Sequence, residues 1–143
     1  MNRERSQARE LALQCLYQLD LRGQEPQTEH TTRDLLGAAE GDVRAHALAL
    51  VEGIQARQEE LIKTLSPLVE HWSWDRVAAV DRAILKIGAY EILHMPEVPP
   101  KVALDEAIEL AKRYSTRESG AFVNGILDKI YRQHAADAAS AAP

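Results

Sequence analysis

A broad apolar surface on one predicted helix, residues 77–93, constrains the fold of this chain more than any other segment. On a helical period of about 3.6 residues, apolar side chains and one glycine cover most of the helix circumference. The residues on this arc are Val77, Val80, Ile84, Leu85, Ile87, Gly88 and Ile92. A helix that faces solvent carries a narrower stripe, so we expect a central helix contacted on several sides. Asp81 and Glu91 lie on or beside the arc, and each should either meet a buried partner or mark an interface.

Composition places the chain among globular proteins without a strongly charged character. It has 143 residues, of which 45% are hydrophobic and 27% are charged, enough for a core of ordinary size. No run of about 18 apolar residues predicts a membrane span, and the N-terminus leads into an amphipathic pattern, not a signal peptide. A cytoplasmic location without membrane contact is therefore expected. The net charge of −5 excludes nucleic-acid binding by bulk electrostatics, so any such contact must come from a local cluster.

Helical periodicity runs through the N-terminal half of the chain. Cys15 lies on the apolar stripe of the first helix, where a buried thiol is expected. Gly23–Thr32 is polar, contains turn-forming residues and predicts a loop. Gly53 should bend the long third helix, because glycine is unfavourable in a helix interior. The predicted helices are Arg3–Leu21, Asp34–Ala39, a long helix from the cap Asp42 to Leu65, and Pro67–His71.

The C-terminal half begins at a joint, Trp72–Asp75, where Ser73 or Asp75 should cap the central helix and both indoles should pack. Prolines between 96 and 100 end the central helix, because each lacks a backbone donor. An amphipathic helix over Lys101–Tyr114 follows. Ser115 and Glu118 have the spacing of a capping box and predict the start of a last helix.

These patterns predict an all-α fold of six to seven helices in two packed three-helix bundles, since no segment alternates with the two-residue period of a strand. We expect one domain over residues 1–134, with an N-terminal half at 1–72 and a C-terminal half at 73–134. The small polar tail, 135–143, is expected to be disordered.

Motifs for catalysis or for cofactor and metal binding do not stand out. There is no glycine-rich phosphate loop and no His-Glu-x-x-His, and the five histidines are scattered along the chain with one cysteine. The acidic pairs Glu59-Glu60 and Asp105-Glu106 fall on predicted solvent faces. The sequence therefore predicts a binding protein without a cofactor or metal, and not an enzyme.

The start of the first helix is the best candidate for a recognition surface. Arg3, Arg5 and Arg9 could reach successive phosphates or stack on bases. The alternative is an ordinary charged face that pairs with neighbouring glutamates. Tyr17 and Phe122 also have two possible roles, because each could belong to the core or to a contact surface.

Several blocks of the sequence, in the same order, resemble the NusB family of transcription antitermination and termination factors. Residues 8–17 resemble the family signature A-R-x-x-A-x-Q-x-L-Y. The segment Val80–Leu93, the segment Pro99–Lys112 and the segment Phe122–Lys129 resemble the rest of its pattern. Together the matching region extends from Arg3 to Tyr131 and covers about two thirds of the chain.

The resemblance implies a NusB-like fold and an RNA-binding factor that is not an enzyme. Such proteins pair with ribosomal protein S-ten (NusE), bind the boxA element of ribosomal RNA leaders, and reach the RNA polymerase elongation complex with other Nus factors. Family RNA contacts map to the arginine-rich start, Arg3, Arg5 and Arg9, and to Glu118 and Phe122; partner contacts map to Tyr17 and Asp81. Ser6 and Gln7 interrupt the basic run of the family, so tight RNA binding is expected to need the partner.

Two other functions fit the same residues. One is a protein-interaction module, for example a homodimer that buries the surface around Tyr17 and Asp81, without RNA binding of its own. The other is a role in ribosome biogenesis. In the central helix, Glu91 is expected to be packed inside and hydrogen-bonded, and Asp81 to be exposed to the protein partner.

Overall fold

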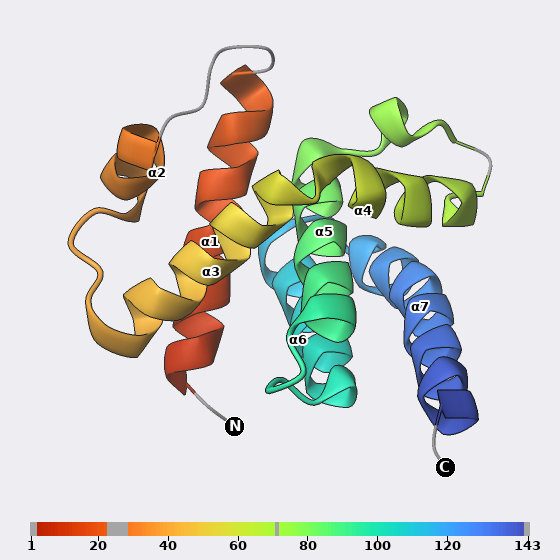
Figure 1. Cartoon of the computed structure of the whole chain (residues 1–143). Coiled ribbons are helices and arrows are strands. Elements are labelled where there is room, and N and C mark those ends of the chain that lie inside the picture. Colours follow the sequence, from red (N-terminus) through yellow and green to blue (C-terminus); the bar gives the residue numbers. More distant parts are fainter. Residues whose placement is uncertain (1–2, 23–28, 71, 142–143) are drawn as a thin grey trace.

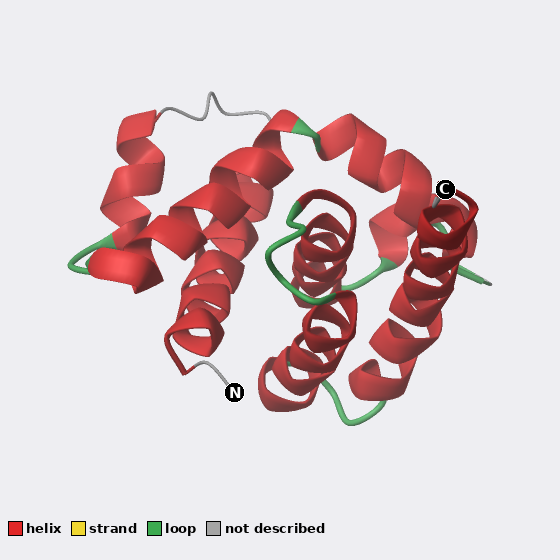
Figure 2. Ribbon diagram, turned by 60° about the horizontal axis from the view of Figure 1, so that its bottom comes forward, coloured by secondary structure: helices red, strands yellow, loops and turns green. Residues whose placement is uncertain are grey.

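The computed structural model describes residues 3–22, 29–70 and 72–141. Within these ranges the chain forms seven α-helices and two short 3₁₀ turns, and no strand (Figure 2). The α-helices are α1 (Arg3–Arg22), α2 (Glu29–Leu36), α3 (Gly41–Ala56), α4 (Gln58–Leu65), α5 (Ala79–His94), α6 (Pro100–Tyr114) and α7 (Ser119–Ala141). The 3₁₀ turns are Ser66–Leu68 and Trp74–Arg76. The predicted all-α fold is confirmed.

Helix α5 occupies the centre of the molecule, as its broad apolar arc predicts. Helices α1 and α3 lie on one side of it and α7 on the other, α6 runs behind it, and α4 crosses near one end (Figure 1). Ile84, Leu85 and Ile87 have no exposed surface. One hydrophobic cluster includes side chains from both halves of the chain, so α5 is where the two helix bundles meet.

Close helix packing around α5 depends on two glycines. A Cβ atom added at Gly88 would lie 2.4 Å from Leu127 Cδ1 and 3.2 Å from Ala107 Cβ, so α5, α6 and α7 approach closely there. A Cβ added at Gly53 would lie 2.0 Å from the hydroxyl oxygen of Tyr90. Gly53 therefore makes room for a side chain of α5, and it is not the point at which its helix is interrupted.

The long helix predicted from Asp42 to Leu65 is instead two helices. Arg57, with φ −115° and ψ 23°, separates α3 from α4. Asp42 is not the cap, because α3 begins one residue earlier and Glu40 precedes it without a side-chain capping bond. The predicted Pro67–His71 helix is a 3₁₀ turn at Ser66–Leu68, and His71 lies outside the described residues.

The joint before α5 also differs from the prediction. Neither Ser73 nor Asp75 caps α5, because residues up to Arg76 form a 3₁₀ turn and Ala78 has extended backbone with ψ 140°. Trp74 is 8% exposed and packs in the core as expected, but Trp72 is 60% exposed. Only one of the two indoles is therefore buried.

Two further boundaries are corrected. The short helix predicted at 34–39 is α2, Glu29–Leu36, and it ends before Gly37, which has φ +59°. Part of the loop predicted at 23–32 lies outside the described residues. The tail predicted to be disordered from 135 continues α7 as far as Ala141. Alanine is the best helix former, and Gln133 donates to Asp137 one turn later. No helix in the described ranges is long and apolar enough to cross a membrane.

Candidate functional site

A buried charged network joins four helices in the interior of the molecule. Arg9 on α1 donates from Nε and Nη2 to the two carboxylate oxygens of Glu91 on α5, at 2.8 and 2.9 Å. His46 on α3 donates from Nε2 to Glu91 Oε2 at 3.0 Å. Arg9 is also 3.7 Å from Glu106 on α6, which accepts a hydrogen bond from Ser6 at 3.0 Å. The expectation that Glu91 is packed and hydrogen-bonded is confirmed.

The same network buries Arg9, one of the three arginines predicted to contact RNA. The Arg9 side chain is 2% exposed, and its guanidinium is held by two carboxylates, so it is a structural ion-pair partner and not a surface cation. Burial alone would raise the pKa of Glu91, but the hydrogen bonds from His46 and Arg9 outweigh it and lower that pKa below the usual 4.5. Glu91 therefore stays ionised in the interior.

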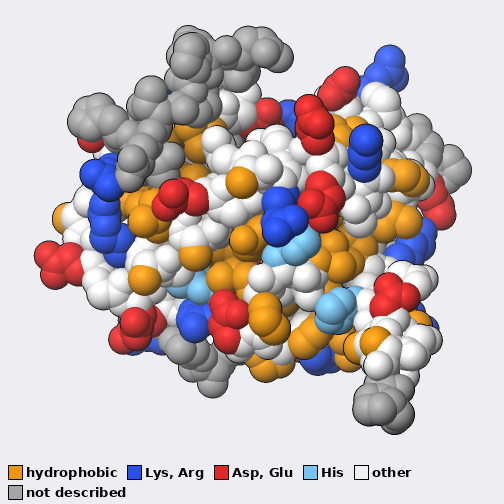
Figure 3. Space-filling view, viewed as in Figure 1, with side chains coloured by type: hydrophobic (Ala, Val, Ile, Leu, Met, Phe, Trp, Pro, Cys, Tyr) orange, Lys and Arg blue, Asp and Glu red, His pale blue; other side chains and the backbone are white. Residues whose placement is uncertain are grey.

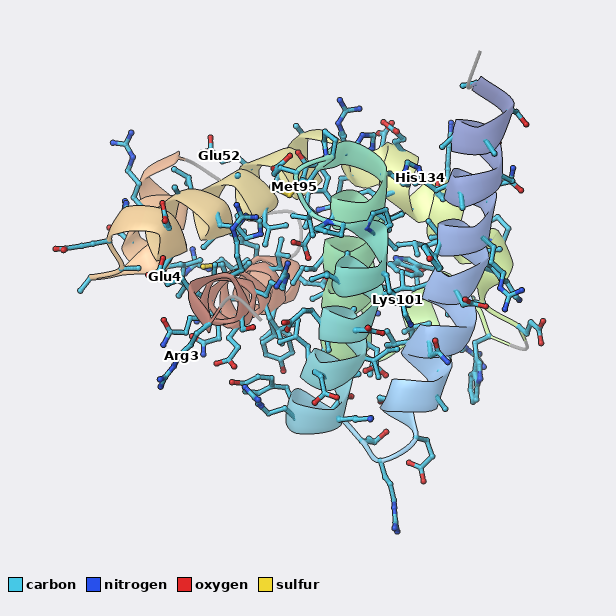
Figure 4. All side chains as sticks on the ribbon, turned by 90° about the horizontal axis from the view of Figure 1, so that it is seen from below. Arg3, Glu4, Glu52, Met95, Lys101 and His134 are labelled. Atoms are coloured by element: carbon cyan, nitrogen blue, oxygen red, sulfur yellow. The ribbon has the colours of Figure 1, made fainter. Side chains whose placement is uncertain are left out.

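The other two arginines predicted to contact RNA, Arg3 and Arg5, lie at the exposed start of α1. Arg3 is exposed and points away from the body of the molecule (Figure 4). Arg5 is half-buried and lines a hollow of about 300 Å³ next to Pro99 and Val102, at the start of α6. These two side chains remain the candidates for contact with an anionic partner at this end of the molecule.

Asp81 is buried, whereas the sequence predicted that it is exposed. It is 8% exposed and accepts hydrogen bonds from Ser115 Oγ at 2.6 Å and from Ser119 Oγ at 3.1 Å. Ser119 Oγ in turn accepts from the backbone N–H of Thr116 at 3.3 Å. Asp81 thus connects the start of α5 to the turn between α6 and α7. Ser115, predicted to belong to a capping box, donates its hydroxyl hydrogen bond to Asp81.

Tyr17 lies on the part of α1 that runs beside the start of α5. It is half-buried. One turn later, Asp20 pairs with Arg82 of α5 at 2.8 Å, and Arg82 also donates to the carbonyl of Val77 at 2.5 Å. The elements that carry Tyr17 and Asp81 are therefore neighbours, as a shared contact surface requires.

A second hollow, of about 260 Å³, contains the two predicted RNA contacts that lie just before α7 and in its first turn. It is lined by Glu118 and Phe122 together with Trp72, Arg76, Thr116 and Asp81. Phe122 is half-buried against the hydrophobic core, whereas Glu118 is exposed. This hollow brings an aromatic ring, an exposed indole and polar side chains from two distant parts of the sequence to one place.

The structure does not bring all predicted RNA contacts together. Arg5 lies by the start of α6, whereas Glu118 and Phe122 follow its end, and a helix of 15 residues is about 22 Å long. Between the two regions, α1 and α6 line a groove of about 520 Å³ that carries more acidic than basic side chains. The charged residues of this groove are Glu10, Asp105, Glu106, Glu109, Lys112 and Arg113. On the face shown in Figure 3, basic side chains are also interspersed with acidic ones and form no stripe.

Several important residues were missed from the sequence. His46 shares a helical row with Leu50 and Ile54, both fully buried, and that spacing could have indicated a buried histidine. Glu106, 6% exposed, lies between the buried Ala103 and Leu110 on α6 in the same way. Nothing in the pattern identified the exposed Trp72. Within the described residues, no group of three or more His, Cys, Asp or Glu side chains is placed to hold a metal.

The family model for the NusB family matches residues 6–132. The chain belongs to the NusB family. The transcription antitermination protein NusB of Desulfitobacterium hafniense (strain DSM 10664 / DCB-2) is 43% identical over 126 residues, covering 86% of this chain and 84% of that protein. The NusB of Geobacillus kaustophilus is also 43% identical, over 127 residues, with 89% and 95% covered.

Solved NusB structures share the fold as well as the sequence pattern. NusB of T. maritima superposes with a TM-score of 0.85 at 34% identity, covering 94% of this chain and 95% of that chain. A chain in the crystal structure of the antitermination factors NusB and NusE with double-stranded RNA superposes with a TM-score of 0.80 at 29% identity, covering 93% and 99%. The described helices, α1 to α7, thus form a NusB fold.

Proposed function

We propose that this chain is a transcription antitermination factor that binds boxA-type RNA of ribosomal RNA leaders together with ribosomal protein S-ten (NusE). The observation that carries the proposal is the similarity, in sequence and over nearly the whole fold, to the NusB chain of a NusB–NusE–RNA complex. Through other Nus factors, the complex would act on the RNA polymerase elongation complex in the cytoplasm. The function is one of binding and does not include catalysis.

The charge distribution supports a requirement for the protein partner. The chain carries a formal net charge of −5, and the groove between α1 and α6 is lined by four carboxylates and two cations. Phosphates are repelled by such a surface, and most of the affinity of nucleic-acid complexes comes from neutralised phosphates. A cationic partner next to this surface would supply the positive charge that the chain itself lacks.

The contacts that we propose differ from the family pattern in two positions. Arg3 and Arg5 contact RNA phosphates at the start of α1, and Glu118 and Phe122 contact RNA at the start of α7. Arg9 holds α1 on α5 through Glu91, so it supports the RNA surface from beneath. Tyr17 contacts the protein partner, and Asp81 supports that surface through Ser115 and Ser119.

Salt dependence of RNA binding tests the two arginine contacts. We expect Arg3→Ala plus Arg5→Ala to weaken boxA binding by the complex with S-ten protein and to make the log–log salt slope shallower by about 1.4, since each single-strand phosphate contact contributes about 0.7. Fluorescence anisotropy of labelled boxA RNA over a series of salt concentrations gives both quantities. An unchanged affinity and slope would show that the arginines do not contact RNA.

A matched control removes two cations from elsewhere on the surface. Lys129 of α7 pairs with Glu70, and Arg132 pairs with Asp128 on α7, and both cations are exposed. Lys129→Ala plus Arg132→Ala changes the net charge by the same amount as the test variant. Because neither residue is among the proposed RNA contacts, their removal should leave the salt slope unchanged.

A further inference from the structure

The exposed indole of Trp72 has no role in the contacts proposed above. It is 60% exposed, although tryptophan is a residue that proteins usually bury for the most part. The other tryptophan, Trp74, is 8% exposed and belongs to the core. Trp72 lines the same hollow as Phe122, so an aromatic ring from the joint before α5 and another from α7 lie at one cavity.

Aromatic side chains at a surface hollow suit an unstacked nucleobase. Single-stranded RNA exposes the faces of its bases, and proteins bind these faces by stacking them on aromatic rings. Phe122 packs partly against the hydrophobic core, which holds its ring in place as the inner wall. The volume, about 260 Å³, is near the lower end of the range for small-molecule sites, about 300 Å³, so it fits a single base rather than a longer stretch of RNA.

The charges of the hollow distinguish a base from a phosphate. Two carboxylates, Asp81 and Glu118, and one guanidinium, Arg76, line it, so a phosphate would meet net repulsion. Carboxylates instead accept hydrogen bonds from the amino groups of bases. Asp81 accepts one hydroxyl bond on each oxygen, and a carboxylate offers about four acceptor positions, so it can accept further bonds.

We propose that this hollow binds one unstacked RNA base that carries an amino group, with Trp72 as the stacking surface and Asp81 and Glu118 as acceptors for the base edge. The inference rests on the proposed RNA-binding function and adds a base-specific contact to it. It assigns the acidic lining to a base and leaves the phosphate contacts to the arginines at the start of α1. Trp72 then takes part in recognition.

Tryptophan fluorescence tests this inference directly in the complex of the full chain with S-ten protein. Addition of boxA RNA should quench the emission of Trp72, at the same midpoint as the anisotropy change of labelled RNA measured in parallel. The Trp72→Phe variant, in which only the buried Trp74 remains, reports the background from the core. We expect Trp72→Ala to weaken RNA binding roughly five- to 150-fold, the range for loss of one stacked base, and Trp72→Phe to weaken it much less.

A matched control removes another exposed apolar side chain. Leu21, at the end of α1, is 65% exposed, and Leu21→Ala should leave RNA affinity unchanged. Circular dichroism should show that all variants keep the helical content of the parent chain. A loss shared by Trp72→Ala and Leu21→Ala would indicate a general effect and would contradict the stacking role.

The readouts separate this inference from the function on which it rests. If labelled RNA binds normally while Trp72 emission and the affinity of Trp72→Ala stay unchanged, the base site is wrong and the RNA-binding function stands. If the emission changes when S-ten protein is added and not when RNA is added, the hollow is a protein contact and the inference is overturned. If the parent chain with S-ten protein fails to bind RNA, the proposed function itself fails.

Discussion

Removal of the Glu91 carboxylate should destabilise the fold strongly, because it leaves the buried guanidinium of Arg9 without its main ion-pair partner. In Glu91→Leu, the guanidinium of Arg9 stays 2% exposed but loses both of its short hydrogen bonds. Breaking a buried ion pair by removing one partner costs about 3–5 kcal/mol. Glu106, 3.7 Å from Arg9, compensates part of the charge, so we expect a loss near the lower end of this range, about 3 kcal/mol.

Urea unfolding followed by circular dichroism measures this loss. For a chain of about 150 residues, 1 kcal/mol corresponds to roughly 2–4 °C, so the melting temperature should also fall by about 6–12 °C. The matched control is Glu109→Leu, which removes an exposed glutamate from a pair with Lys112 at 3.7 Å. Surface substitutions of this kind usually change stability by no more than about 0.5 kcal/mol.

The double variant Arg9→Met plus Glu91→Leu distinguishes loss of the pair from loss of either side chain. Replacing both members of a buried ion pair with apolar side chains is often neutral or stabilising. His46 and Glu106 would still lose partners, so the double variant should remain less stable than the parent but more stable than Glu91→Leu alone. A Glu91→Leu loss below about 1 kcal/mol, or a double variant as unstable as the sum of the singles, would refute the reasoning.

Two further predictions concern acid stability and helix packing. Because the folded-state pKa of Glu91 is lowered, its contribution to stability is present above pH 4.5 and is lost as the pH falls through the still lower folded-state value. Urea unfolding at several pH values should therefore show that the stability of Glu91→Gln falls less steeply below pH 4.5 than that of the parent chain. Gly53→Ala should destabilise the protein by about 1–3 kcal/mol, because its Cβ would lie 2.0 Å from the Tyr90 hydroxyl. In a Tyr90→Ala background the same change should become neutral or stabilising, and an equal loss in both backgrounds would show that the close contact is not the cause.

The helical architecture was largely predictable, because apolar side chains recur at the helical period. The apolar arc on residues 77–93 predicted a central helix. The position of Glu91 in the middle of this arc predicted, without further information, that Glu91 is buried in the protein interior. The boundaries were less predictable. The interruption at Arg57 and the extended residues before Ala79 depend on how neighbouring helices cross, which local propensity does not specify.

The candidate site was predicted less well, since burial of a charged residue depends on a distant partner. Arg9 hydrogen-bonds to Glu91, 82 residues away in the sequence, and Asp81 accepts a hydrogen bond from Ser115, 34 residues away. Periodicity puts both charged residues near apolar rows but does not reveal these partners. The family resemblance suggested contact residues there, whereas in the structure both side chains are buried and hydrogen-bonded.

The cooperativity of RNA and partner binding tests the proposed function most directly. The affinity of labelled boxA RNA should be measured for the purified chain alone and with saturating S-ten protein. We predict a ternary complex in which the partner tightens RNA binding roughly 5- to 150-fold, and in which RNA tightens partner binding by the same factor. Equal RNA affinity with and without the partner, or no complex with S-ten protein, would contradict it.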